Sequence, residues 1–137
     1  MSYLHRQKIL FRYCDPDGFV FYPRLVEIIN DAVEGFFADV LDWPFEEMLK
    51  TGGTPTVNLN IDFHAPAVHG DRLELALDVV RLGQSSLELS HEARVAGAPC
   101  FSARHTLVRI GAKEPRGAEP WPGPVRARIE TLLKGTP

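Results

Sequence analysis

One short stretch of the chain carries the residue types that could do chemistry. Residues 13–23 read YCDPDGFVFYP, which places the carboxylate of Asp15 in a tight turn and Pro23 at the start of an amphipathic segment. A helix start leaves backbone N–H groups without partners and carries the positive end of the helix dipole. A carboxylate held beside such amides can attack a carbonyl, or activate water against it, while the amides hold its oxygen. The stretch therefore indicates acyl transfer or hydrolysis.

Asp15 is the candidate catalytic group, although the turn has a structural explanation of its own. Asp-Pro-Asp-Gly is a favoured type I turn, so the residues of the turn alone do not require a function. The helix start seven residues later favours the catalytic interpretation. The carboxylate can attack a thioester directly, which gives a mixed anhydride, or it can orient a water molecule. Asp17 is interpreted as a turn residue, and the side chain of Cys14 is expected to point away from that of Asp15.

A long helix must follow this turn. From Pro23 to Leu41 the apolar residues recur every three or four positions, which is typical of a helix with one wide apolar stripe. Proline is favourable at the first helical position because its missing N–H would have no partner there. The opposite side is predicted to face water and carries these acidic residues: Glu27, Asp31, Glu34 and Asp39.

The remainder of the chain shows mainly the two-residue period of β-strands. A first strand is expected over residues 5–12, with Ile9 and Phe11 on one face, and a short helix over residues 45–50 that Gly52-Gly53 ends. Alternating apolar residues then predict four more strands, over 57–63, 73–79, 87–95 and 101–107. A Gly- and Pro-rich loop over 111–124 and a closing helix over 126–134 complete the chain.

These elements predict an α+β fold in which an antiparallel sheet of about five strands curls around the long helix. At 137 residues, with 45% apolar and 24% charged residues, the chain is expected to form a single domain over residues 1–137. The five histidines show no spacing typical of a metal site.

Composition also narrows the classes of partner. The net charge of −3 gives no electrostatic argument for nucleic acid, and the mildly basic segment 111–137 is interpreted as solvated surface. No apolar run approaches the roughly 20 residues of a membrane span, and the start of the chain has no apolar core of a signal peptide. Two cysteines are too few for a disulfide framework, so a reducing cytoplasm is the expected location.

The chain resembles hotdog-fold acyl-CoA thioesterases of the 4-hydroxybenzoyl-CoA thioesterase type. The motif that carries the resemblance is Asp15-Pro16-x-Gly18-x-Val20-x-Tyr22-Pro23 followed by the long helix. Two weaker matches are Gly53-Thr54-Pro55, which opens a strand, and the turn Gly83-Gln84-Ser85-Ser86. The order of elements fits the family as far as about residue 110.

The resemblance implies a set of site residues. Asp15 matches the family's catalytic carboxylate, the backbone N–H of Tyr22 matches the group that polarises the thioester carbonyl, and Gly18 lets the loop approach the substrate. Phe45 lies near an acyl-pocket position of the family. The remaining expected substrate-binding residues are Phe19 and Phe21 at the acyl group and Ser85 and Ser86 at pantetheine.

The resemblance also implies hydrolysis of an acyl-CoA to a carboxylate and CoA, without metal or redox cofactor. The acyl group stays open between aromatic, short aliphatic and medium aliphatic. The family forms its sites at a dimer interface, and many members are tetramers, so a homo-oligomer is expected. A non-catalytic module that binds acyl-CoA or an acyl carrier is the alternative. A hotdog hydratase ranks last, because no compact motif pairs a histidine with an acid.

Overall fold

The computed structural model describes residues 2–134 and contains one five-stranded sheet, a two-stranded ribbon and three α-helices in that part of the chain. The strands are β1 (Tyr3–Lys8), β2 (Gly52–Gly53), β3 (Thr56–Phe63), β4 (Arg72–Leu82), β5 (Ser86–Val95), β6 (Ala98–Val108) and β7 (Ile110–Gly111). The helices are the 3-10 turn η1 (Phe11–Tyr13), α1 (Tyr22–Asp39), α2 (Phe45–Met48) and α3 (Gly123–Lys134).

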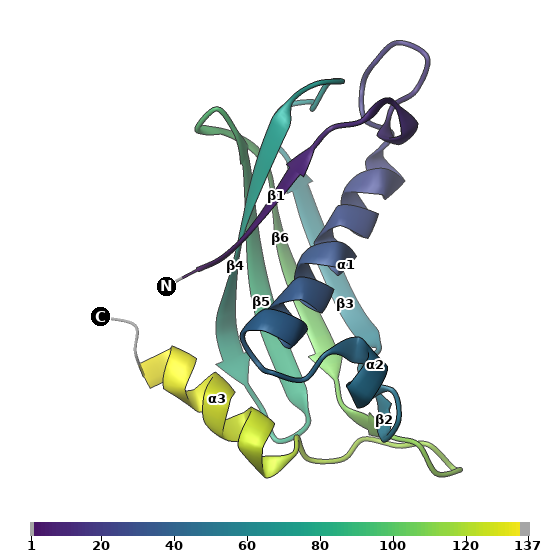
Figure 1. Ribbon diagram of the computed structural model, residues 1–137, viewed down its shortest axis with the longest axis vertical. Coiled ribbons are helices and arrows are strands. Elements are labelled where there is room, and N and C mark those ends of the chain that lie inside the picture. Colours follow the sequence, from purple (N-terminus) through teal and green to yellow (C-terminus); the bar gives the residue numbers. More distant parts are fainter. Residues whose placement is uncertain (1, 135–137) are drawn as a thin grey trace.

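Helix α1 lies across one face of the five-stranded sheet (Figure 1). Its apolar stripe is buried against the inner residues of the strands, because both surfaces are apolar and each removes the other from water. The buried stripe consists of Leu25, Ile28, Ile29, Ala32, Val33, Phe36 and Phe37. The four acidic residues predicted for the opposite side are exposed, as expected. The predicted α+β hotdog architecture is therefore confirmed.

The strand order in the sheet is β1-β4-β5-β6-β3, and all neighbours are antiparallel. Short turns join β4 to β5 and β5 to β6, as their spacing predicts. Strand β3 precedes β4 in the chain but pairs with β6, so β1 and β3 form the two edges. Strand β3 therefore presents one edge that has no partner strand within residues 2–134.

The first strand differs from its prediction. It covers Tyr3–Lys8 rather than residues 5–12, and the chain then enters the 3-10 turn η1. The amide of Ile9 still donates to the carbonyl of Asp71, but Tyr13 and Cys14 donate back to Leu10 and Phe11 and so end the extended run. Ile9 is buried, whereas Phe11 is 64% exposed, so the expectation that both lie on one face is wrong.

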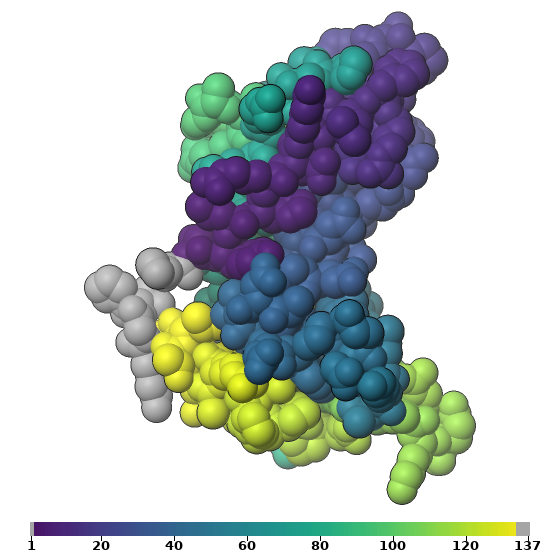
Figure 2. All heavy atoms as spheres, in the orientation of Figure 1, coloured from purple at the N-terminus to yellow at the C-terminus, as the bar shows by residue number. Residues whose placement is uncertain are grey.

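The C-terminal segment closes the end of the sheet that lies farthest from η1. The indole of Trp121 donates to the carbonyl of Ser86, and α3 packs beside β4. Residues 110–111 form β7, a short strand that the sequence pattern did not reveal, and the loop that follows it protrudes from the body in light green (Figure 2). No helix within residues 2–134 is both long and apolar enough to cross a bilayer.

Gly52 provides a test of this packing. A Cβ atom there would meet the backbone oxygen of Ile110 and lie 2.9 Å from the guanidinium of Arg109, which is itself buried over Trp43. We expect Gly52→Ala to lower the free energy of unfolding by about 2–3 kcal/mol. Neither the backbone of Ile110 nor the buried guanidinium of Arg109 can move easily to make room for the new methyl group. Urea denaturation measures this change.

The neighbouring glycine is the matched control. A Cβ at Gly53 would meet only side-chain atoms, the nearest 3.4 Å away on Arg116, so Gly53→Ala should cost less than about 1 kcal/mol. Equal losses in the two variants would contradict this account of the ribbon formed by β2 and β7.

Candidate active site

Asp15 lies in a closed turn between η1 and α1. The loop is held at its base by pairing of Cys14 with Val20, and the amide of Asp15 donates to the carbonyl of Phe19 over 2.8 Å. Gly18, whose amide donates to the carbonyl of Asp15, has φ +85°, a conformation that suits glycine. The turn that the sequence predicts is thus present.

The carboxylate of Asp15 is anchored through one oxygen only. Oδ1 accepts hydrogen bonds from the amides of Asp17, at 3.0 Å, and Phe19, at 3.2 Å. Within the described part of the chain, Oδ2 has no hydrogen-bond or ion-pair partner, and the side chain is half-buried. The turn therefore fixes the direction of the carboxylate and leaves one oxygen available to a substrate or a water molecule.

The start of α1 follows directly. The amide of Phe21 donates to the carbonyl of Tyr13, which ties the helix start to the beginning of the turn. Tyr22 is the first of the 18 helical residues, Pro23 has no N–H, and no side chain caps the helix. The first turn also contains no acidic residue. The Tyr22 amide and the positive end of the helix dipole are therefore available to an oxyanion.

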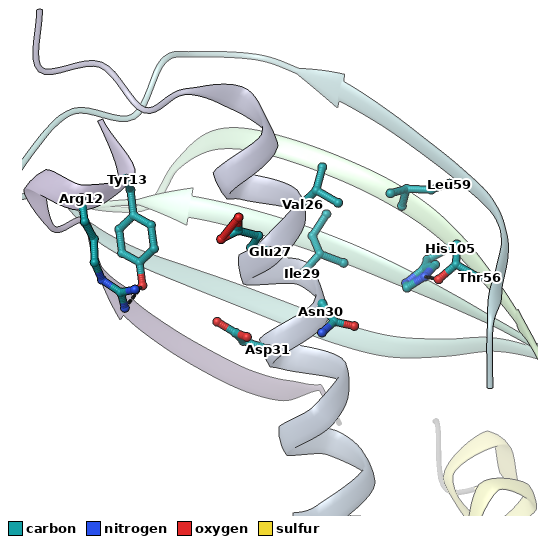
Figure 3. Close-up of a pocket in the computed structure, with 10 residues that line it drawn as sticks. All are labelled: Arg12, Tyr13, Val26, Glu27, Ile29, Asn30, Asp31, Thr56, Leu59 and His105. Atoms are coloured by element: carbon teal, nitrogen blue, oxygen red, sulfur yellow. Dashed lines mark hydrogen bonds between the residues drawn. The ribbon is translucent and has the colours of Figure 1, made fainter. Parts of the chain in front are cut away.

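A cavity of about 720 Å³ lies between α1 and strand β3. Arg12 and Tyr13 form one end and Thr56 and His105 the other (Figure 3). Between them lie the helix residues Val26, Glu27, Ile29, Asn30 and Asp31, with Leu59 on β3. The volume is typical of a small-molecule pocket. Three aliphatic side chains, Val26, Ile29 and Leu59, line it together with polar and charged residues.

A β-bulge directs Thr56 into this pocket. Thr56 lies opposite Leu107, whereas Asn58 lies opposite Thr106, so Val57 is an extra residue in β3. Without the bulge, strict alternation would place Thr56 on the outer face together with Asn58. With it, Thr56 shares the face of Leu59. Thr56 is not predicted as a site residue from the sequence, because alternation of apolar and polar residues does not reveal a bulge.

Two buried histidines, His105 and His91, form a chain of close polar contacts with Thr56. The Nε2 atom of His105 lies 2.7 Å from the hydroxyl of Thr56, and its Nδ1 lies 3.4 Å from Nε2 of His91. Burial lowers the pKa of His105, and burial together with the neighbouring His105 lowers the pKa of His91 to about 3. Both rings are therefore neutral near pH 7.

The predicted acyl-group residues do not all lie in one place. Phe19 and Phe21 are exposed, at 46% and 53%, on the loop around the helix start. Phe45 packs edge-on against Phe37 and lines a smaller hollow of about 370 Å³, which shares Asn30 and Thr56 with the main pocket. Neither Asp15 nor Tyr22 lines the main pocket within a single chain.

Ser85 and Ser86 lie at the far end of the sheet from Asp15. The turn around Asp15 contacts the residues just before the first residue of β4, whereas the two serines come after the last residue of β4. Because β4 has eleven residues, its two ends lie about 36 Å apart. The carbonyl of Ser85 accepts from the amide of Arg109, and that of Ser86 accepts from Gly83 and Trp121. A role at pantetheine remains a prediction for these serines.

The other candidates near the turn have local partners. The thiol of Cys14 points to the carbonyl of Leu10, and partial burial together with the charge of Asp15 raises its pKa, which disfavours a thiolate nucleophile. Asp17 is exposed, and its amide supports Asp15. The ring of His64 lies 2.9 Å from the hydroxyl of Ser102, and that of His69 packs against Phe11.

Fold and turn together define a hotdog protein with a carboxylate at the start of its long helix. Residues 9–129 match the thioesterase-like superfamily, and the chain belongs to that family. The match confirms the predicted family and the predicted enzyme class, an acyl-CoA thioester hydrolase.

Individual relatives agree with this assignment. The chain is 26% identical over 106 residues to a 1,4-dihydroxy-2-naphthoyl-CoA hydrolase of Synechococcus elongatus, covering 75% of this chain and 77% of the relative. A gentisyl-coenzyme A thioesterase structure superposes with a TM-score of 0.83 at 24% identity, covering 92% of this chain and 98% of that one.

A third similar protein is a 4-hydroxybenzoyl-CoA thioesterase, whose mutant has a solved structure in complex with 4-hydroxybenzoyl-CoA. It superposes with a TM-score of 0.85 at 22% identity and covers 93% of this chain and 98% of that one. At these identities the two solved structures support the fold of this chain.

Proposed function

We propose that this protein hydrolyses CoA thioesters of hydroxylated aromatic acids, with Asp15 as the catalytic carboxylate and the Tyr22 amide as the oxyanion donor. The observation that carries the proposal is the half-anchored carboxylate of Asp15 beside the uncapped start of an 18-residue helix. An amide donor at a developing oxyanion typically contributes about 10²–10³ in rate.

Both mechanisms that the carboxylate allows give the same products. Oδ2 of Asp15 attacks the thioester carbon, CoA leaves as the thiolate, and water then cleaves the mixed anhydride, or Oδ2 takes a proton from a water molecule that attacks directly. Either route consumes one water molecule and yields one carboxylate, one CoA thiol and one proton. Because a thiolate is a good leaving group, the residues at the turn need not include a strong general acid.

The proposed aromatic substrate class rests on the pocket and on the relatives. A cavity of about 720 Å³ is large enough for one or two rings, and its apolar walls include Val26, Ile29 and Leu59. The three relatives act, by their names, on dihydroxynaphthoyl, gentisyl and hydroxybenzoyl esters of CoA. All three acyl groups are aromatic and carry hydroxyl groups.

We further propose that two or more copies, each folded as one domain, assemble in the cytoplasm to complete the site. Asp15 and the pocket do not meet within one chain, so a second copy would bring the turn of one subunit to the pocket of the other. The unpaired edge of β3 and the exposed apolar side chains Phe21, Tyr22, Val57 and Phe63 support such an interface. A homotetramer is the expected assembly.

The proposal is tested by comparing kcat/KM for hydroxybenzoyl-, dihydroxynaphthoyl-, benzoyl-, butyryl- and octanoyl-CoA by release of free thiol. We expect the hydroxylated aromatic esters to exceed the aliphatic esters by at least about tenfold, since the pocket can contact both ring and hydroxyl. A preference for an aliphatic ester would overturn the substrate class. Hydrolysis of none of them would overturn the proposed activity.

A further inference from the structure

We infer that Thr56 is a hydrogen-bond donor of fixed orientation, which selects acyl groups that carry a ring hydroxyl. His105 and His91 are the positioning residues that fix the orientation of this donor. The inference deepens the proposed function and rests on it. It concerns the end of the pocket formed by Thr56 and His105 (Figure 3).

The first step is the placement of the hydroxyl. The bulge at Val57 turns Thr56 to the inner face of the sheet, where Thr56 lines both the main pocket and the smaller hollow. Bulges are often found next to active sites, where they bend the strand and redirect a side chain. On the facing helix, Asn30 lines the same two cavities, so the two polar side chains lie where the cavities meet.

The second step is the direction of the hydrogen bonds. The Nδ1 atom of His91 is buried and has no hydrogen-bond partner among the described residues. If Thr56 donated to His105, then His105 would donate to His91, and His91 would have to carry its proton on this unpartnered Nδ1. A buried N–H without an acceptor is rare and costly.

The opposite direction avoids that cost. His91 then donates from Nε2 to Nδ1 of His105, His105 donates from Nε2 to Thr56, and the unpartnered nitrogen of His91 carries only a lone pair. The hydroxyl oxygen of Thr56 is already an acceptor in this arrangement. Its own proton must therefore point elsewhere, and Thr56 borders the open pocket.

The third step is the chemistry of the ligand group. A donor in the pocket wall requires an acceptor atom, and the oxygen of a ring hydroxyl is such an atom. The carboxylates of Glu27 and Asp31 also line the pocket, and Arg12 lies at its other end, so Thr56 and His105 form a neutral end. A neutral hydroxyl fits there better than a carboxylate, because it can accept from Thr56 and still donate to Asn30.

The experiment compares two substrates in matched variants. The readout is the ratio of kcat/KM for the preferred hydroxybenzoyl-CoA isomer to kcat/KM for benzoyl-CoA. We expect Thr56→Val, which keeps the shape and removes the donor, to lower this ratio about 5- to 30-fold. Thr106→Val removes a hydroxyl from the outer face of neighbouring β6 and should leave the ratio unchanged. An unchanged ratio in Thr56→Val would overturn the inference.

The role of the histidines needs its own variants. His105→Leu should lower the ratio, because the Thr56 hydroxyl is then free to turn away from the substrate. His105→Gln, whose amide can still donate to Thr56, should restore part of it. Equal ratios in His105→Leu and His105→Gln would contradict a positioning role, even if both variants lose stability.

A binding measurement separates this inference from the proposed activity. Phenacyl thioethers of CoA, with and without a ring hydroxyl, cannot be hydrolysed, and calorimetry gives their Kd values. If the wild-type protein binds the hydroxylated thioether more tightly and Thr56→Val removes the difference, the inference stands even without turnover. If the protein hydrolyses the esters but binds both thioethers equally, the inference fails while the proposed function stands.

Discussion

Asp15→Asn is expected to lower kcat by at least about 10²-fold while the fold is retained. The asparagine oxygen can still accept from the amides of Asp17 and Phe19, so the turn keeps its hydrogen bonds. What disappears is the negative charge on Oδ2, and with it the ability to attack a thioester or to take a proton from water. Steady-state thiol release from a hydroxybenzoyl ester measures the loss.

Asp17→Asn is the matched control for this experiment. It neutralises a carboxylate two residues away, in the same loop, whose side chain is exposed. We expect a change of less than about threefold, since the Asp17 carboxylate is exposed and the residue supports Asp15 through its backbone amide. If both variants lose kcat to a similar extent, the negative charge of the loop matters and Asp15 has no special role. If both keep the wild-type kcat, Asp15 is not the catalytic carboxylate.

Acidification is expected to destabilise the fold through His91. Its pKa is about 3 in the folded protein, against 6.5 for an unperturbed histidine, so below pH 6.5 the unfolded chain binds a proton that the folded protein does not. Stability is therefore full above pH 6.5 and is lost as pH falls toward 3, by up to about 1.4 kcal/mol per pH unit and about 5 kcal/mol in all. The lowered pKa of His105 acts in the same direction.

Denaturant titrations between pH 7 and pH 4 test this expectation. His91→Leu replaces the ring by an apolar side chain, so the unfolding free energy of this variant should depend less steeply on pH than that of the wild type. His69→Leu, at an exposed position, should keep the wild-type slope. A His91→Leu slope as steep as the wild-type slope would assign the acid sensitivity to other groups.

The sequence predicts the elements of this fold better than it predicts their arrangement. The stripe from Leu25 to Phe37 has the helical period over more than three turns, so α1 is found almost to the residue. The alternating runs likewise predict β3, β4, β5 and β6. Their order in the chain does not reveal that β3 pairs with β6, because strand pairing depends on contacts between distant residues.

The candidate site likewise has a part that the sequence predicts and a part that it does not. The turn around Asp15 and the helix start at Tyr22 are local features, and both are present as predicted. The pocket end is not local, since His105 and Thr56 are 49 positions apart and meet only through the pairing of β3 with β6. The bulge that turns Thr56 inward adds one residue to the strand, and no turn residue marks it.

The roles of Ser85, Ser86 and Phe19 in binding the substrate stay predictions. The two serines lie at the far end of the sheet, and Phe19 is exposed beside the helix start.

The most direct test of the account is to follow the complete reaction of one substrate. The wild-type protein is incubated with a hydroxybenzoyl-CoA in water enriched in oxygen-18, and the products are separated and analysed by mass spectrometry. The account predicts equimolar CoA and hydroxybenzoate, with the heavy oxygen in the carboxylate. Recovery of the intact ester, bound to the protein, would contradict it and would indicate a module that binds acyl-CoA without hydrolysing it.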